Sequence, residues 1–139
     1  MKTIRIPIVV AVICLLTAGC IPETGNPNLA GSWTCSETSE IFLKSTKGTK
    51  GTSIYQVTFE KDALSTDKYY IDNIYKLGNG IKVSVIKSGY AITLPKQTVN
   101  GFNFEGSGVI NESFDLISMT YTADDGGGQV DHVTAEYSR

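Results

Sequence analysis

The strongest constraint on how this chain can fold is an alternation of apolar and polar residues that recurs from Leu29 onward. In the segment 55–60, for example, Tyr55, Val57 and Phe59 fall on one face and polar residues fall on the other. Successive side chains of a β-strand point in opposite directions, so this pattern indicates strands with one buried face. No window shows the period of about 3.6 residues that an amphipathic helix requires. The sequence therefore predicts an all-β, antiparallel fold.

The alternating segments predict a series of short strands separated by turns rich in Gly, Asn and Asp. Gly78-Asn79-Gly80 and Ser88-Gly89 are short enough for tight hairpins, which join consecutive antiparallel strands. The eight predicted strands are Ser32–Glu37, Ser53–Glu60, Lys68–Tyr75, Ile81–Lys87, Tyr90–Pro95, Phe102–Ile110, Leu116–Thr122 and Val130–Tyr137.

Strands joined in this way leave two exposed sheet edges unless the sheet closes on itself. Closure into an up-and-down (meander) β-barrel of about eight strands removes both edges. Gly106 and Gly108 support closure, because they share a face with Phe102 and Phe104, where a strongly bent strand leaves no room for side chains. A β-sandwich of two sheets is the alternative fold.

The segment Thr38–Thr52 is too long for a tight hairpin and is rich in Lys, Gly and Thr. It is predicted to be a solvated loop. The alternative is a flap over one barrel mouth, where its lysines would meet an anionic ligand. The segment lacks the Gly-Lys-Ser/Thr ending of a phosphate-binding loop, so nucleotide binding is excluded.

The N-terminal segment has the pattern of an export signal. Lys2 and Arg5 precede an apolar stretch over residues 6–18 that is too short to span a bilayer. Small residues then lead to a cysteine, and Leu16-Thr17-Ala18-Gly19-Cys20 resembles the lipobox of bacterial lipoproteins, whose cysteine is acylated. An ordinary secretory signal that happens to contain a cysteine is the alternative.

The lipobox resemblance implies three parts of the chain. Residues 1–19 are expected to be a lipoprotein signal peptide, 20–28 the lipidated Cys20 with a Pro- and Gly-containing tether, and 29–139 the barrel domain. Cys20 would join the domain to a membrane through its acyl chains. Because no Asp follows Cys20, the resemblance implies the outer membrane, with the face unspecified.

The charge balance argues against a nucleic-acid-binding protein, and the cysteine content argues against an internal disulfide. The whole chain has 12 Lys and Arg against 14 Asp and Glu, and removing Lys2 and Arg5 with the signal leaves a more acidic domain. That balance argues against nucleic-acid binding. Of three cysteines, Cys14 lies in the signal and Cys20 carries the lipid, so only Cys35 remains and no internal disulfide is expected.

The barrel segment resembles a known family. The Gly-x-Trp of Leu29-Ala30-Gly31-Ser32-Trp33 at the first strand is similar to that of the lipocalins, and the whole segment is similar to small lipocalin-like bacterial lipoproteins. In lipocalins this tryptophan closes one barrel end. The other similar stretches are Tyr70-Ile71-Asp72-Asn73-Ile74-Tyr75-Lys76-Leu77-Gly78, Leu94-Pro95-Lys96-Gln97-Thr98-Val99-Asn100-Gly101, Phe104-Glu105-Gly106-Ser107-Gly108 and Val133-Thr134-Ala135-Glu136-Tyr137.

A catalytic thiol is not expected. Cys35 shares its strand face with Trp33 and is predicted to point inward, where an unpaired thiol behaves as a small apolar residue. His132, the one histidine, has the parity of the outer face, so the two cannot form a nucleophile–base pair. A single histidine and a single free cysteine also argue against a zinc site.

The acidic residues give no better catalytic or metal site. Asp124, Asp125 and Asp131 lack the spacing of an EF-hand and are predicted to form a soluble turn. Glu105 and Glu112 have no defined separation, so a glycosidase pair is not expected. We therefore expect no catalytic residue, no metal and no cofactor.

Aromatic side chains predicted to face inward are the best candidates for a binding site. If the barrel holds a cavity, these side chains line it and tyrosine hydroxyls supply polar contacts. The expected function is non-enzymatic binding of a small hydrophobic or amphipathic molecule. The alternative is a structural or protein-interaction lipoprotein with a filled core. The candidate residues are Trp33, Tyr55, Phe59, Tyr69, Tyr75, Phe102, Phe104, Met119 and Tyr121.

Overall fold

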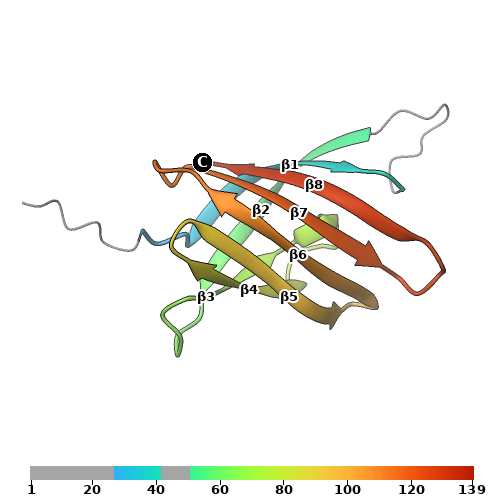
Figure 1. The fold of residues 1–139 in the computed structure, drawn as a ribbon, viewed down its shortest axis with the longest axis horizontal. Coiled ribbons are helices and arrows are strands. Elements are labelled where there is room, and N and C mark those ends of the chain that lie inside the picture. The colour runs from blue at the N-terminus through green and yellow to red at the C-terminus, as the bar shows by residue number, and fades with distance from the viewer. Residues whose placement is uncertain (1–26, 42–50) are drawn as a thin grey trace, which may run out of the picture.

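Every predicted strand segment forms a strand, and the strands close into an antiparallel barrel in sequence order (Figure 1). The computed structural model describes residues 27–41 and 51–139. Each strand pairs with the next, and pairing of β1 with β8 completes the ring. The elements are β1 (Gly31–Ser39), β2 (Gly51–Lys61), β3 (Lys68–Asp72), η1 (Ile74–Lys76), β4 (Lys82–Ser88), β5 (Ala91–Val99), β6 (Phe102–Ile110), β7 (Leu116–Asp124) and β8 (Val130–Ser138). The predicted all-β meander barrel is confirmed, and the β-sandwich alternative is wrong.

The predicted loop over Thr38–Thr52 is wrong at both ends. Thr38 pairs with Thr52 and Ser39 pairs with Gly51, so β1 and β2 extend into it as strands. The central residues 42–50, with their lysines, lie outside the described residues.

The third predicted strand, Lys68–Tyr75, is too long. Strand β3 ends at Asp72, because Asn73 adopts a left-handed backbone conformation with φ of 68° that a strand cannot continue. A single turn of 3-10 helix, η1, follows it. Tyr75 lies in η1 and still has only 4% of its surface exposed.

Closure requires a close approach between β6 and β7. A Cβ at Gly106 would collide with the carbonyl oxygen of Thr120 and the Cβ of Tyr121, and one at Gly108 would collide with Met119. Only glycine fits at these two positions, as the sequence predicted. On the other side of β6, a register shift between Leu94 and Gln97 marks an irregularity in the pairing with β5.

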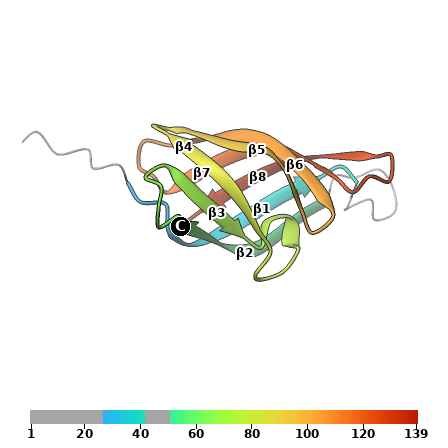
Figure 2. The same ribbon diagram turned by 90° about the horizontal axis from the view of Figure 1, so that it is seen from below.

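The up-and-down order gives the barrel two different ends. We call the end where β1 begins the Trp33 end; it carries the β2–β3, β4–β5 and β6–β7 connections. We call the opposite end the mouth; it carries η1, the β5–β6 turn and the β7–β8 connection. In Figure 2 the mouth lies to the right, with the β7–β8 connection projecting from it. Within residues 27–41 and 51–139, no helix is long and apolar enough to cross a bilayer.

Candidate functional site

The interior at the Trp33 end is packed with aromatic side chains. Trp33 and Phe59 have ring centroids 5.5 Å apart, and Phe59 meets Tyr137 edge to face at the same distance. The indole Nε1 of Trp33 donates a hydrogen bond of 2.8 Å to the carbonyl oxygen of Leu29, which is itself fully buried. This part of the barrel is a closed core.

Arg139 covers the outside of this core. Its guanidinium carbon lies 4.4 Å from the centroid of the Trp33 ring, within the range of a cation–π contact. The same group donates hydrogen bonds of 3.0 and 3.2 Å to the carbonyl oxygen of Phe114 and one of 3.3 Å to that of Asn28. It therefore ties the start and the end of the barrel together beneath Trp33.

Toward the mouth the interior becomes polar around Glu37. This residue follows Trp33 and Cys35 on the inward face of β1 and is only 4% exposed. Its Oε2 accepts hydrogen bonds of 2.5 Å from the hydroxyls of Tyr55 and Tyr121. Both bonds therefore reach the same oxygen of this buried carboxyl.

Asp131, on β8, is the second buried carboxyl and is 2% exposed. Its Oδ2 accepts hydrogen bonds from Ser39 and, at 2.6 Å, from the hydroxyl of Tyr75. Its Oδ1 accepts the backbone N–H groups of Glu40 and Ile41 at 2.8 and 3.0 Å. Asp131 thus joins β1, β8 and η1 where the barrel opens.

A cavity of about 210 Å³ opens at the mouth above this carboxyl, and aromatic and polar side chains share its walls. Tyr75 and Phe102 have ring centroids 5.5 Å apart, and Tyr75 also meets Phe104 at 6.2 Å. The lining residues are Ile41, Tyr75, Phe102, Ala123, Asp125, Gly127, Gln129 and Asp131. The mouth therefore offers an apolar wall beside a carboxylate.

The two carboxyls differ in how burial and hydrogen bonding balance. Burial raises the pKa of Glu37 and the nearby charge of Asp131 raises it further, and together they outweigh the opposing hydrogen bonds from Tyr121 and Tyr55. Burial also acts to raise the pKa of Asp131, but the hydrogen bonds from Ser39, Tyr75 and two backbone N–H groups reverse this and hold it below its usual range. Asp131 is thus the stable anion of the pair, and Glu37 gains a proton more readily.

Cys35 lies deeper than Glu37 in the barrel. Burial, followed by the charge of Glu37, raises the pKa of its thiol to about 12, which disfavours the reactive thiolate at neutral pH. His132 is exposed on the outer face of β8, as its parity predicted. The structure therefore separates the one free cysteine and the one histidine on opposite faces.

The interior also contains two phenols without good hydrogen bonds. The hydroxyls of Tyr69 and Tyr137 are buried and have no hydrogen-bond partner of acceptable geometry within the described residues. Tyr137 faces Cys35 across the β1–β8 pair and interacts with its thiol electrostatically. Neither phenol lines the mouth cavity.

The nine candidate binding residues fall into three groups inside the barrel. Tyr75, Phe102 and Phe104 form the aromatic wall at the mouth, where the first two line the cavity. Tyr55 and Tyr121 donate hydrogen bonds to the carboxyl of Glu37. The remaining four, Trp33, Phe59, Tyr69 and Met119, are at most 1% exposed and belong to the packed core.

Sequence reasoning missed the polar members of the site. Glu37 has the parity of Trp33 and Cys35, so an acidic residue on an apolar face was the available signal. Asp131 was predicted to lie in a soluble turn, and this is wrong, because it is buried in β8 and paired with Ala123. Asp124 and Asp125 do cap the turn, accepting N–H groups of Gly126 and Gly127 at 2.8 Å.

The outer face carries a second, larger depression. It measures about 420 Å³ and lies over β1, β6, β7 and β8. Its lining is largely hydroxyl and charged side chains, with Thr38, Thr120, Thr134 and His132 among them. Glu105 lies in this depression and Glu112 is exposed in the turn after β6, so the two glutamates do not form a pair.

No group of three or more His, Cys, Asp or Glu side chains in the described ranges is placed to hold a metal ion. No protein-family model matches this chain, and no curated protein matches it. The barrel and its mouth are therefore the features that indicate a function.

Proposed function

We propose that this chain is a lipid-anchored lipoprotein of the bacterial outer membrane that binds a small amphipathic molecule at its barrel mouth, without catalysis. The observation that carries the proposal is the mouth cavity of about 210 Å³, in which the rings of Tyr75 and Phe102 stand beside the carboxylate of Asp131. An apolar wall with a few placed polar groups is the usual composition of a ligand site.

The polar groups at the mouth favour a ligand with a hydrogen-bond-donating, positively charged head. The two carboxyls that line the cavity, Asp125 and Asp131, are acceptors when ionised, and the aromatic rings attract a cation through their faces. A carboxylate head would instead meet two like charges. The cavity is smaller than the range of about 300–1,000 Å³ typical of drug-sized ligands, so the ligand is expected to be small.

We also propose that the barrel is lipocalin-like, and the Trp33 end supports this. In lipocalins a tryptophan closes one barrel end and an arginine packs over it, but no such arginine was evident from this sequence. Arg139 lies over Trp33 in this way. The lipobox at Cys20 supports the anchor. Cys20 precedes β1 in the sequence, and β1 begins at the Trp33 end of the barrel.

A second candidate is a structural lipoprotein that meets an envelope partner through its outer surface. The packed core around Trp33 and Phe59 favours it, as does the outer depression of about 420 Å³, which is larger than the mouth cavity. In this case the mouth would bind no small molecule.

A matched pair of ligands separates the two candidates. The mature chain would be titrated calorimetrically with an alkylammonium and with the alkyl carboxylate of the same length. We expect the ammonium to bind more tightly, and Ala123→Leu, which fills the cavity, to abolish its binding. Ala91→Leu, at an exposed position of the Trp33 end, is the control and should change nothing. Equal binding to the Ala123→Leu variant would contradict a mouth site, and preference for the carboxylate would point to the lysines of residues 42–50.

A further inference from the structure

We infer that the Trp33 end of the barrel docks on the bilayer surface that holds the lipid anchor, so that the mouth points away from the membrane. The inference rests on the lipid anchor of the proposed function and adds an orientation to it. The partner is the interfacial zone of the lipid bilayer.

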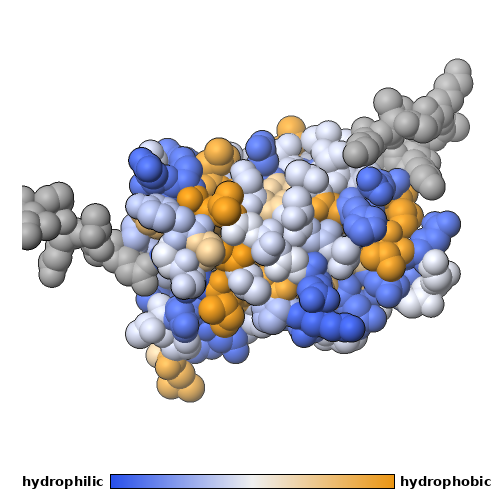
Figure 3. Space-filling view, in the orientation of Figure 1, coloured by the Kyte–Doolittle hydropathy of each residue, from blue (hydrophilic) through white to orange (hydrophobic). Residues whose placement is uncertain are grey.

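Exposed apolar side chains gather on the connections of the Trp33 end. Leu64, in the β2–β3 connection, is 99% exposed, Tyr90, between β4 and β5, is 51% exposed, and Leu116, at the start of β7, is 36% exposed. Phe114 packs against Tyr90 with ring centroids 5.2 Å apart. Figure 3 shows apolar residues on the surface at this end, at the projecting corner below it and at the opposite end. Ile54 and Val130 are exposed toward the mouth on two separate strands, whereas the side chains at the Trp33 end share the connections of that end, and a cluster of this kind marks an interaction surface.

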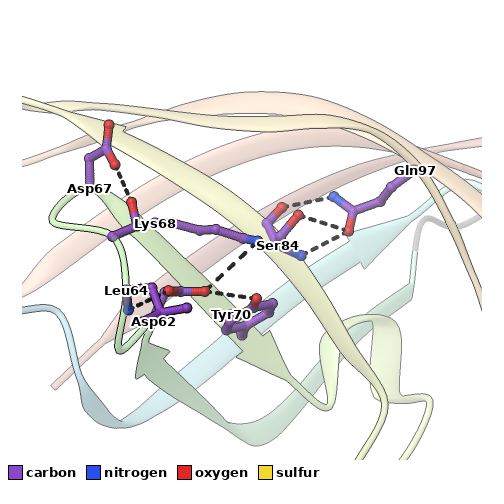
Figure 4. Close-up of polar contacts among 8 residues, drawn as sticks. Asp62, Leu64, Asp67, Lys68, Tyr70, Ser84 and Gln97 are labelled. Carbon is purple, nitrogen blue, oxygen red and sulfur yellow. Dashed lines mark hydrogen bonds and ion pairs between the residues drawn. The ribbon is translucent and has the colours of Figure 1, made fainter.

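The connection that carries Leu64 is held in a defined shape (Figure 4). The Oδ1 of Asp62 accepts the N–H of Leu64 at 2.8 Å, and its Oδ2 accepts the hydroxyl of Tyr70 at 2.9 Å. Ser65 donates to Asp67 at 2.6 Å across the same turn. Because these hydrogen bonds fix the backbone, the exposed side chain of Leu64 projects from a structured turn.

Hydrogen bonds and ring contacts join these connections into one surface. The N–H of Lys87 donates to the carbonyl of Asp67 at 2.8 Å, and its ammonium lies 5.5 Å from the ring centroid of Phe114. The carbonyl of Phe114 in turn accepts the guanidinium of Arg139. Lys87 is only 4% exposed, so Arg139 is the cation at the margin of these aliphatic and aromatic groups, and this composition favours the membrane interface.

The tether enters the barrel at this same end. The carbonyl oxygen of Asn28 accepts a hydrogen bond from the guanidinium of Arg139, and that of the buried Leu29 accepts one from the indole of Trp33. From Cys20 to Pro27 the chain can reach at most about 25 Å when fully extended. A nine-residue strand spans about 30 Å, so an anchor at Cys20 brings the Trp33 end to the membrane more readily than the mouth.

The orientation can be read from the depth of two fluorophores. Leu64→Cys and Val130→Cys place single accessible thiols at the Trp33 end and at the mouth, because Cys20 is acylated and Cys35 is buried. Each full-length lipoprotein, labelled with a nitrobenzoxadiazole dye, is reconstituted into phosphatidylethanolamine–phosphatidylglycerol vesicles containing a headgroup-attached nitroxide lipid. We expect the dye at 64 to lose most of its fluorescence and to shift to the blue, while the dye at 130 keeps both its intensity and its colour.

Equal quenching at the two positions, or stronger quenching at 130, would overturn the docking surface. Leu64→Cys combined with Tyr90→Ser is the second variant, and quenching at 64 should fall in it. Metabolic labelling of Cys20 with palmitate reports separately on the anchor. If no acyl group is attached, the chain from residue 21, which lacks Cys20 and carries an N-terminal polyhistidine on nickel-chelating vesicles, gives the same two readings, so loss of the anchor and loss of docking are distinguishable.

Discussion

The guanidinium of Arg139 lies 4.4 Å above the ring of Trp33 and is held there by the carbonyl oxygens of Phe114 and Asn28. The contact joins the two ends of the described barrel on the outside of the core, where Trp33 is fully buried. It closes the barrel at the end opposite the polar mouth.

Removing this contact should destabilise the barrel modestly. Arg139→Ala loses a cation–π contact and hydrogen bonds at a partly solvated site, so we expect the free energy of unfolding to fall by about 1–2 kcal/mol. Arg139→Lys keeps the charge but not the planar fork and should recover only part of the loss. Urea denaturation followed by the fluorescence of Trp33, the one tryptophan, measures both variants. A fully stable Arg139→Ala protein would contradict a structural role for the contact.

The bend between β6 and β7 gives a second prediction. Gly106→Ala places a Cβ against the backbone of Thr120 and should cost about 3 kcal/mol, because a strand backbone cannot move aside. Gly127→Ala is the matched control: its Cβ would lie 2.9 Å from the Oδ1 of Asp125, a flexible side chain, and should cost under about 0.5 kcal/mol. Thermal unfolding of the two variants compares them directly, and equal melting temperatures would argue against the close approach.

Glu37 predicts a loss of stability as pH rises. Its pKa in the folded state is raised above the ordinary value of 4.5, chiefly by burial. Between these two pKa values the folded state binds more protons than the unfolded state, so stability falls with increasing pH through this window. Glu37→Gln removes that dependence. The difference in unfolding free energy between Glu37→Gln and the parent should therefore rise with pH and then level off; a difference that is flat with pH would contradict a buried, strained carboxylate.

Asp131 predicts the opposite slope in acid. Its pKa is held below the ordinary value of 3.8, since hydrogen bonds from Ser39, Tyr75 and two backbone N–H groups overcome the cost of burial. Its stabilising contribution is complete above pH 3.8 and is lost as pH falls through the folded pKa. Asp131→Asn should cost about 1–3 kcal/mol at neutral pH, and the cost should shrink in acid. A cost of Asp131→Asn that stays the same from neutral to acid pH would contradict this role of the carboxylate.

The alternation of apolar and polar residues was sufficient to predict the architecture. It placed eight strands, one buried face for each, and the barrel closure indicated by Gly106 and Gly108, all of which the structure confirms. Patterns of this kind report which face is buried, because burial selects residue type at every second position. They report strand ends poorly, since β1 and β2 pair through Thr38 and Thr52, which composition alone marks as loop residues.

The polar site could be predicted only in part. The tyrosines were placed inside by parity, but parity gives no information on which hydroxyl meets which carboxyl. Tyr121 reaches Glu37 from a strand 84 residues away, and Tyr75 reaches Asp131 from a 3-10 turn that the strand pattern did not indicate. An acid on an apolar face is a weak signal on its own, because its meaning depends on partners that only the closed barrel brings together.

Native mass spectrometry of the full chain, extracted in mild detergent from the membranes of its own host, tests the lipid anchor and the ligand-binding mouth together. We predict a polypeptide that begins at Cys20 with an attached diacylglyceryl group, together with a small non-covalent mass. That extra mass should be lost on denaturation and absent from the Ala123→Leu variant, whose added methyl groups occupy the mouth cavity. A chain that keeps residues 1–19, lacks the acyl group and carries no additional mass would contradict both the lipid anchor and the ligand-binding mouth.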